Sequence, residues 1–187
     1  MHCDNSRSSA QEFEQPVPDF SLPTLDGVAR DLQFFIEGKK GLVVFFWSET
    51  CSHCQRYDGY FNCFAERYPQ LGLVAIASRQ GEDPEQIRAT AAERNLRFPI
   101  LYDSGSLVAK RWYAQLTPRV YLIDAGRHLL YRGAIDNFRY PEDSEYVAYL
   151  EPAIESFLSG KPIERRETAN FGCEIRSIYY SLSKPFA

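Results

Sequence analysis

Two cysteines separated by two residues, Cys51 and Cys54, have the side chains and the spacing that thiol-disulfide exchange requires. An apolar run over residues 43–47 precedes them, and Ser52 stands where a helix is expected to begin. A buried strand holds the first sulfur in place, and the unpaired N–H groups and positive dipole end of a helix stabilise a thiolate, the reactive form of cysteine. The pattern predicts a redox dithiol in which Cys51, at the exposed helix edge, attacks and Cys54, one turn further in, resolves the mixed disulfide.

The length and composition describe one folded domain. The chain has 187 residues, of which 44 % are hydrophobic, and it contains 13 Phe and 12 Tyr, which is enough for a single full core. The formal net charge is -4 and the Lys and Arg residues are scattered, which argues against a nucleic-acid partner. No stretch is long and apolar enough for a membrane-spanning helix.

Strands and helices are expected to alternate around the dithiol. Buried strands are predicted over residues 42–47 and 71–77, joined by one continuous helix over residues 52–68 in which Gly59 marks a kink. The other expected elements are a short hairpin in residues 16–27, a helical turn over 31–37, a helix from Asp83 to about Asn95, an extended piece over 98–102, a helix over 107–113, a hairpin of strands 120–124 and 129–132, and a helix over 144–158. Parallel strands need crossovers, so the pattern predicts an α/β fold with a central mixed sheet and helices on both faces.

Three segments are expected along the chain. Residues 1–15 form a flexible polar arm, residues 16–160 form the domain with its amino-terminal hairpin, and residues 161–187 form an irregular C-terminal extension. The first ten residues lack the apolar stretch of a secretory signal, which is expected either of a cytoplasmic protein or of one whose signal has been removed.

Four landmarks occur in a fixed order: the opening at residues 18–27, Phe46 and Trp47 before the dithiol, Thr117-Pro118, and the strand over residues 120–124. This order resembles the thioredoxin superfamily and, within it, the redoxin branch with thiol-disulfide oxidoreductases of the TlpA and ResA type. The resemblance covers residues 16–158. It implies a thioredoxin-like fold and a monomer that exchanges disulfides with protein clients and an unidentified redox partner without an organic cofactor. It also implies a periplasmic or otherwise extracytoplasmic location, with the cytoplasm as the alternative.

The resemblance assigns roles to further residues. It places Pro118 in a cis peptide beside the dithiol, where Thr117 offers backbone groups to an extended client chain. It also favours His53 as a partial cation that lowers the pKa of Cys51 and makes the pair more oxidising.

Two departures from thioredoxin itself stand beside these matches. The buried Asp six residues before the first Cys is here Phe45, which argues against a fast general reductase, and the Trp directly before that Cys is Thr50. Glu49 is interpreted as a solvated loop residue.

The count of five cysteines is odd, so at least one thiol is outside any complete set of internal disulfides. Cys63 is predicted to be a buried structural thiol that cannot reach Cys54 across the helix. Cys173 has several open roles, namely a bond to Cys63 or Cys3, a third redox thiol or an inert residue, and a structural role is favoured over a catalytic one. Cys3 is interpreted as incidental, with lipidation possible only behind a removed leader.

Two other functions would use the same dithiol. A peroxiredoxin-like thiol peroxidase shares the amino-terminal opening, but that class normally has Thr three residues before the reactive Cys, and Cys51 holds that position relative to Cys54. A copper or cytochrome-assembly chaperone would need a further ligand. His128 is a weak candidate and His2 is isolated, so no metal site is expected.

Overall fold

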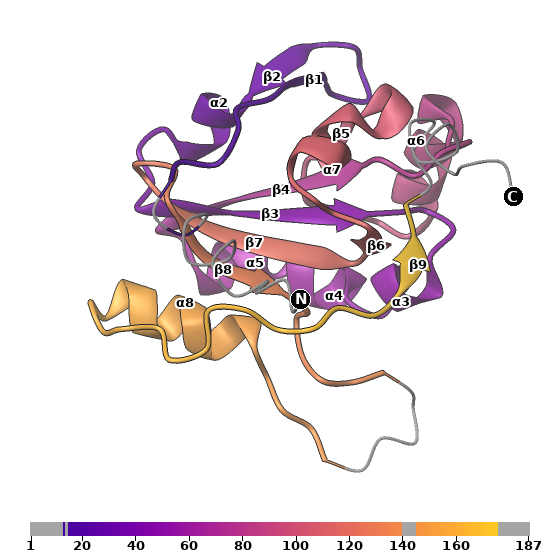
Figure 1. The fold of residues 1–187 in the computed structure, drawn as a ribbon. Coiled ribbons are helices and arrows are strands. Elements are labelled where there is room, and N and C mark those ends of the chain that lie inside the picture. Colours follow the sequence, from indigo (N-terminus) through magenta and orange to yellow (C-terminus); the bar gives the residue numbers. More distant parts are fainter. Residues whose placement is uncertain (1–12, 14, 140–144, 176–187) are drawn as a thin grey trace, which may run out of the picture.

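The computed structural model describes residues 13, 15–139 and 145–175. A five-stranded mixed sheet lies at its centre, in the order β5-β4-β3-β7-β8 (Figure 1). The strands are β3 (Gly41–Trp47), β4 (Leu71–Ala77), β5 (Ile100–Tyr102), β7 (Arg119–Asp124) and β8 (Leu129–Gly133). β3, β4 and β5 run parallel to one another, whereas β7 is antiparallel to both of its neighbours. The predicted α/β class and mixed sheet are confirmed.

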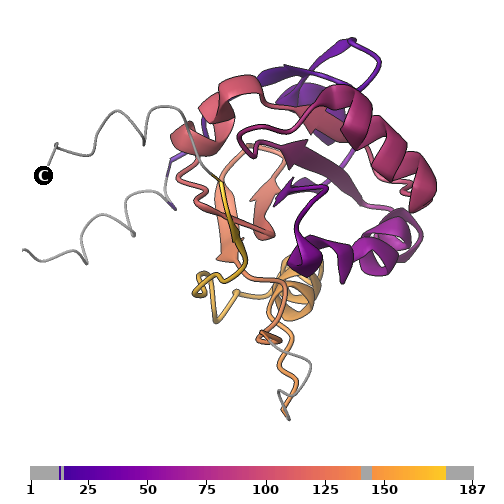
Figure 2. The ribbon, with the colours of Figure 1, turned by 90° about the vertical axis from the view of Figure 1, so that its right-hand side faces the viewer.

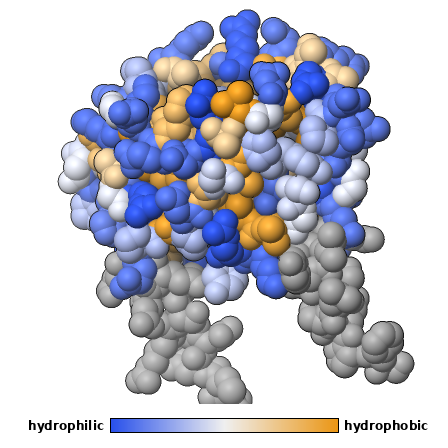
Figure 3. All heavy atoms as spheres, turned by 90° about the horizontal axis from the view of Figure 1, so that it is seen from above, coloured by the Kyte–Doolittle hydropathy of each residue, from blue (hydrophilic) through white to orange (hydrophobic). Residues whose placement is uncertain are grey.

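Helices cover both faces of the sheet (Figure 1). They are α2 (Leu32–Ile36), α3 (Ser52–Gln55), α4 (Asp58–Asn62), α5 (Phe64–Arg67), α6 (Pro84–Glu93), α7 (Leu107–Arg111) and α8 (Leu150–Leu158), with a 3₁₀ turn η1 (Ser104–Ser106) before α7. Side chains of α2 and α7 enter one apolar cluster, and side chains of α4, α5, α6 and α8 enter the other. No helix in the described part of the chain is long and apolar enough to cross a membrane. Polar residues cover most of the face in Figure 3, and apolar residues are visible between them.

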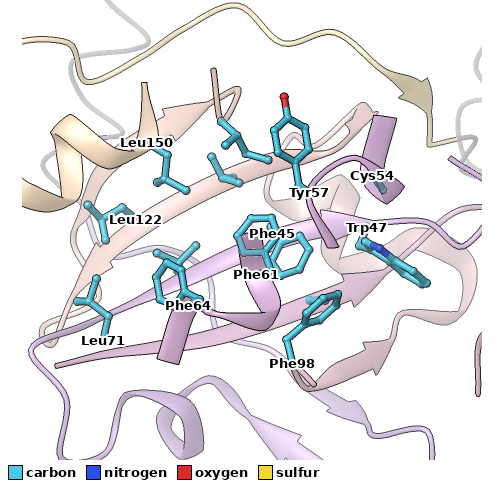
Figure 4. Close-up of a cluster of buried hydrophobic side chains, with 14 of the residues drawn as sticks. Phe45, Trp47, Cys54, Tyr57, Phe61, Phe64, Leu71, Phe98, Leu122 and Leu150 are labelled. Carbon is cyan, nitrogen blue, oxygen red and sulfur yellow. The ribbon is translucent and has the colours of Figure 1, made fainter. Parts of the chain in front are cut away.

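The central strand β3 contributes side chains to both clusters, because successive side chains of a strand point to opposite faces. Its odd-numbered residues from Val43 to Trp47 enter the cluster under α4, and its even-numbered residues from Leu42 to Phe46 enter the other. Phe45 stacks on Phe61 with ring centroids 3.9 Å apart (Figure 4). Packing on both faces therefore fixes the end of β3, where the dithiol follows.

The amino-terminal hairpin forms a separate small sheet. Strands β1 (Ser21–Pro23) and β2 (Ala29–Asp31) are antiparallel, and Thr24 bridges Leu101 of the edge strand β5. The second strand lies beyond Gly27, later than predicted. Asp31 ends it and caps α2 by accepting a hydrogen bond from the N–H of Phe34 at 2.9 Å.

The predicted continuous helix over residues 52–68 is wrong, because the chain forms three short helices there. The breaks fall at Tyr57 and Cys63, whose ψ angles are 4° and 0°, and not at Gly59. The N–H of Tyr57 bonds the carbonyl oxygen of Cys54, three residues back, which tightens the turn after the dithiol. The Tyr57 hydroxyl donates to Asp136 at 2.6 Å and holds the break against the end of the sheet.

Helix α8 begins at Leu150 and not near residue 144, which itself lies outside the described residues. Val147 instead exchanges hydrogen bonds with Asn137, and the N–H groups of Tyr149 and Leu150 both bond the carbonyl oxygen of Ile135. These contacts hold the segment before α8 in an extended form. The predicted start of α6 is confirmed, since Asp83 accepts hydrogen bonds from the N–H groups of Glu85 and Gln86.

The extension after α8 runs back along the sheet before its last strand. The N–H of Arg132 in β8 bonds the carbonyl oxygen of Arg166, and the N–H of Thr168 bonds that of Arg132. Strand β9 (Cys173–Glu174) then pairs antiparallel with β6 (Leu116–Thr117). The amino-terminal arm, apart from Phe13 and Gln15, lies outside the described residues, and the predicted domain limits stay predictions.

Candidate active site

The dithiol lies where β3 ends. Four residues after Trp47, Cys51 occupies the N-cap of α3, and Cys54 lies inside that helix. The two thiols hydrogen-bond to each other. The fold brings the loop between β6 and β7 to the same place: the Thr117–Pro118 peptide bond is cis, and the Cys51 sulfur lies 3.2 Å from the carbonyl oxygen of Thr117.

Cys51 is not at an exposed helix edge, so this prediction is wrong. Its relative exposure is 0 %, and that of Cys54 is 2 %. Thr117 lies against Cys51 on one side, and the thiol of Cys173 hydrogen-bonds to it from the C-terminal extension. The sulfur that was expected to meet a client is therefore covered by the chain's own segments.

The thiol of Cys51 is strongly acidic. Its pKa is lowered from 9.0 to about 4, first because the Cys54 thiol donates a hydrogen bond to the thiolate. Burial opposes this shift, and the side chains of Cys173 and Thr117 and the backbone N–H of Cys54 add to it. At neutral pH the reduced site thus holds one thiolate among three sulfurs.

This cause differs from the expected one. Helix α3 is only four residues long, so its dipole is small. The one N–H group of this helix that lowers the pKa of Cys51 is that of Cys54, and its effect is the smallest of those named above. His53 is not among the contributors to the pKa of Cys51. Its ring instead contacts Phe171 of the extension edge-on, with centroids 6.3 Å apart. Tuning by His53 stays a prediction.

Cys54 has the opposite character. Burial raises its pKa well above 9.0, and the neighbouring Cys51 thiolate raises it further. The backbone N–H of Ser48 and the side chain of Thr117 partly offset this by hydrogen-bonding the sulfur. A protonated inner thiol beside an ionised outer one is the arrangement that a nucleophile and a resolving thiol need.

The sequence interpretation did not place Cys173 next to the dithiol. A structural role was favoured, yet its thiol is free and hydrogen-bonds to Cys51. Burial raises its pKa to about 11, and the Cys51 thiolate adds to that rise. The Gly172-Cys173 pair in the tail was the only signal, and the sequence held no measure of its distance from the dithiol.

The prediction that Cys63 is buried is wrong. Phe61, Phe64 and Tyr68 are the buried residues of this segment, and Cys63 between them is exposed. Their spacing of three and four residues already placed the inward face. Cys63 is free and lies outside the site, whereas Cys3 is not among the described residues.

The interpretation of Glu49 as a solvated loop residue is wrong, and a second buried acid near the site, Glu82, was not identified from the sequence. Glu49 is buried and not solvated: its carboxylate accepts a hydrogen bond from Thr90 at 3.1 Å. Glu82 is also buried and accepts the N–H of Glu49 at 3.0 Å, while the Ser48 hydroxyl bonds the same carboxyl group. Burial raises the pKa of Glu82. Phe45 occupies the position of the missing Asp, inside the cluster of buried hydrophobic side chains in Figure 4.

The histidine named as a weak metal candidate, His128, has a carboxylate partner. His128 pairs with Asp124, its Nδ1 lying 3.2 Å from a carboxylate oxygen. No group of three or more possible ligands occurs among residues 13, 15–139 and 145–175, and His2 lies outside them.

Known proteins resemble this chain in sequence and in fold. The sequence pattern of the AhpC/TSA family matches residues 13–132. Thiol-disulfide oxidoreductase ResA from Bacillus cereus is 27 % identical over 119 residues, 64 % of this chain and 68 % of that protein. Thiol-disulfide oxidoreductase YkuV from Bacillus subtilis is 29 % identical over 119 residues, 60 % of this chain and 79 % of that protein. A hypothetical protein from Sinorhizobium meliloti has a solved structure with a TM-score of 0.77 and 29 % identity, covering 86 % of this chain and 92 % of that one.

Proposed function

This chain belongs to the AhpC/TSA family, and from that premise we propose that it exchanges disulfides with protein clients through Cys51 and Cys54. Relatives named thiol-disulfide oxidoreductases support an oxidoreductase of the thioredoxin type. The observation that carries the proposal is a thiolate at Cys51, held by the Cys54 thiol beside the Thr117–Pro118 loop.

The proposed reaction has two steps. The Cys51 thiolate attacks one sulfur of a client disulfide, and the other client sulfur leaves as a thiolate that takes up a proton. Cys54 then loses its proton and attacks the sulfur of Cys51, which releases the second client thiol and leaves a Cys51–Cys54 disulfide. Two electrons pass from the dithiol to the client, and the reverse sequence oxidises a client dithiol.

Client binding uses the backbone of Thr117. An extended client chain would pair with β6 as an added strand, which presents its disulfide to Cys51. The cis Pro118 lies next to this strand. In the resting molecule β9 holds that position, so the client must displace it.

Disulfide reduction of insulin tests the proposal. Cys51→Ser is expected to abolish the reaction, whereas Cys54→Ser/Cys173→Ser, which removes both thiols that hydrogen-bond to Cys51, is expected to retain the client as a mixed disulfide that a reductant releases. Cys63→Ser is the matched control, because this thiol is exposed and outside the site, and it should reduce insulin at the wild-type rate. Full activity in Cys51→Ser would end the proposed mechanism.

The same preparations test the alternatives that the family membership allows. Peroxide consumption by the reduced protein far faster than by a free thiol would favour the thiol peroxidase. One equivalent of copper retained through dialysis would favour an assembly chaperone. The proposed setting is a monomer outside the cytoplasm, and cell fractionation with sizing of the purified protein tests both points.

A further inference from the structure

The C-terminal extension occupies the edge at which a client would dock. Strand β9 pairs antiparallel with β6, with Cys173 opposite Thr117 and Glu174 opposite Leu116. The N–H of Ile175 continues the pairing by bonding the carbonyl oxygen of Gln115 at 2.8 Å. Figure 2 looks onto this end of the molecule and shows the yellow segment running across it. The pairing is of the kind expected between this loop and an extended client.

The thiol of Cys173 stands where a client sulfur would stand. It hydrogen-bonds to Cys51, and the backbone N–H of His53 at the start of α3 also points to it. Glycine at position 172 makes the approach possible. Its φ is +149°, and a Cβ there would collide with the carbonyl oxygen of Thr117.

Contacts further back hold the extension in this position. The Thr168 hydroxyl lies 2.8 Å from the Tyr131 hydroxyl and accepts the N–H of Ala134 at 2.9 Å. Glu167 pairs with Arg132 of β8 at 2.8 Å. Beyond these anchors, β9 itself is only two residues long, so it can leave the docking edge while the extension stays attached.

We propose that the extension is an internal substrate: Cys173 exchanges disulfides with Cys51, and β9 closes the docking edge until a client displaces it. The proposal rests on the proposed function, because Cys51 must be the reactive thiol. The family pattern ends at residue 132 and does not include Cys173.

The exchange step is balanced within the molecule. In the oxidised protein, the Cys173 thiol loses its proton and its sulfur attacks the Cys51 sulfur of the Cys51–Cys54 disulfide. A Cys51–Cys173 bond forms, the Cys51–Cys54 bond breaks, and Cys54 leaves as a thiolate that takes up the proton. No electrons enter or leave, so one disulfide moves between two positions.

The redox state of Cys51 controls this step. In the reduced protein burial raises the pKa of Cys173 and the Cys51 thiolate raises it further, so Cys173 stays protonated and donates its hydrogen bond. Once Cys51 is in a disulfide, that negative charge is gone and Cys173 ionises more readily. Oxidation thereby activates Cys173, and the Cys51–Cys173 bond ties β9 over Thr117.

Disulfide mapping of the full chain tests the chemistry. Reduced Cys54→Ser is treated with oxidised glutathione, digested without reductant and analysed by mass spectrometry. The expected product links Cys51 to Cys173, because glutathione on Cys51 is displaced by the neighbouring thiol. Cys54→Ser/Cys173→Ser should stop at glutathione on Cys51, whereas Cys54→Ser/Cys63→Ser should still form the internal link.

The results separate this proposal from the proposed function. Glutathione on Cys51 together with a free Cys173 in the Cys54→Ser protein would overturn the internal exchange, and wild-type insulin reduction would then still support the client reaction. Absence of both insulin reduction and any modification of Cys51 would remove the proposed function and this proposal with it.

The covering role of β9 has a test that leaves every sulfur in place. Gly172→Ala should push β9 off β6 and raise the rate at which iodoacetamide alkylates Cys51 by about tenfold, since only a few net hydrogen bonds hold the strand. Gly160→Ala is the control, because its φ is also positive, at +69°, but nothing lies near its Cβ. Equal alkylation rates in Gly172→Ala and Gly160→Ala would overturn the covering role.

Discussion

Acidifying the reduced protein should protonate the Cys51 thiolate near pH 4. The perturbation is the pH itself, because hydrogen bonds from Cys54, Cys173 and Thr117 hold the pKa of Cys51 at about 4 and not at 9.0. A thiol with the lower pKa is about 99.9 % ionised at pH 7, whereas one at 9.0 is about 1 % ionised. The folded protein should therefore carry about one thiolate per chain at neutral pH.

The same numbers decide what the thiolate does. Ionisation gains about 100-fold in attacking species at pH 7, but the intrinsic reactivity of so weak a base falls by about 200-fold, so the rate of attack hardly changes. The equilibrium changes far more. A thiolate stabilised from 9.0 to about 4 shifts the balance between disulfide and dithiol toward the dithiol by up to about 10³-fold at pH 7. The Cys51–Cys54 disulfide is thus expected to accept electrons readily from a partner dithiol, which makes the oxidised protein the better oxidant.

Thiolate absorbance at 240 nm measures the effect. The reduced protein is titrated from pH 8 to pH 3 while near-ultraviolet circular dichroism follows folding, so that acid unfolding is not mistaken for protonation. Cys51→Ser should lose the step, whereas the exposed Cys63→Ser control should keep it. Glutathione buffers at pH 7 then report the fraction of oxidised protein.

The stability of the reduced protein follows from the sign of the shift. The folded pKa of Cys51 lies below the unfolded value of 9.0, so unfolding between these values takes up a proton. The stabilisation is fully present above pH 9 and is lost as the pH falls toward 4. An absorbance step with its midpoint above pH 7, or an unchanged step in Cys51→Ser, would refute the assignment of the thiolate to Cys51.

Two further substitutions test the surroundings of the dithiol. Burial raises the pKa of Glu82 above the unfolded value of 4.5. The contribution of Glu82 to the stability of the fold therefore falls as the pH rises through the folded pKa. Glu82→Gln should increase the free energy of unfolding at pH 7 by about 1 kcal/mol and have little effect at pH 4. Denaturant titrations at both pH values check this, and equal effects at both would contradict it. Phe45→Ala removes a ring stacked on Phe61 and should lower the free energy of unfolding by about 3–5 kcal/mol. The exposed Phe34→Ala should change it by less than about 1 kcal/mol, and a similar loss in both variants would argue against the stacked core.

Local sequence patterns determined the parts of the site that depend on neighbours in the chain. The apolar run before Cys51 predicts a buried strand, and the structure places it as β3 in the centre of the sheet. Asp83 followed by Pro84 predicts the start of α6, because capping needs only adjacent residues. The family resemblance also placed Pro118 correctly in a cis peptide.

Tertiary structure decided the remainder, because contacts between distant segments have no local signal. The burial of Cys51 and the meeting of Cys51 with Cys173 both follow from the pairing of β9 with β6. That pairing depends on where the extension is anchored along β8, which no periodicity in residues 161–175 records. Likewise, packing around Tyr57 broke the expected helix, so the sequence located the dithiol while the fold determined what surrounds it.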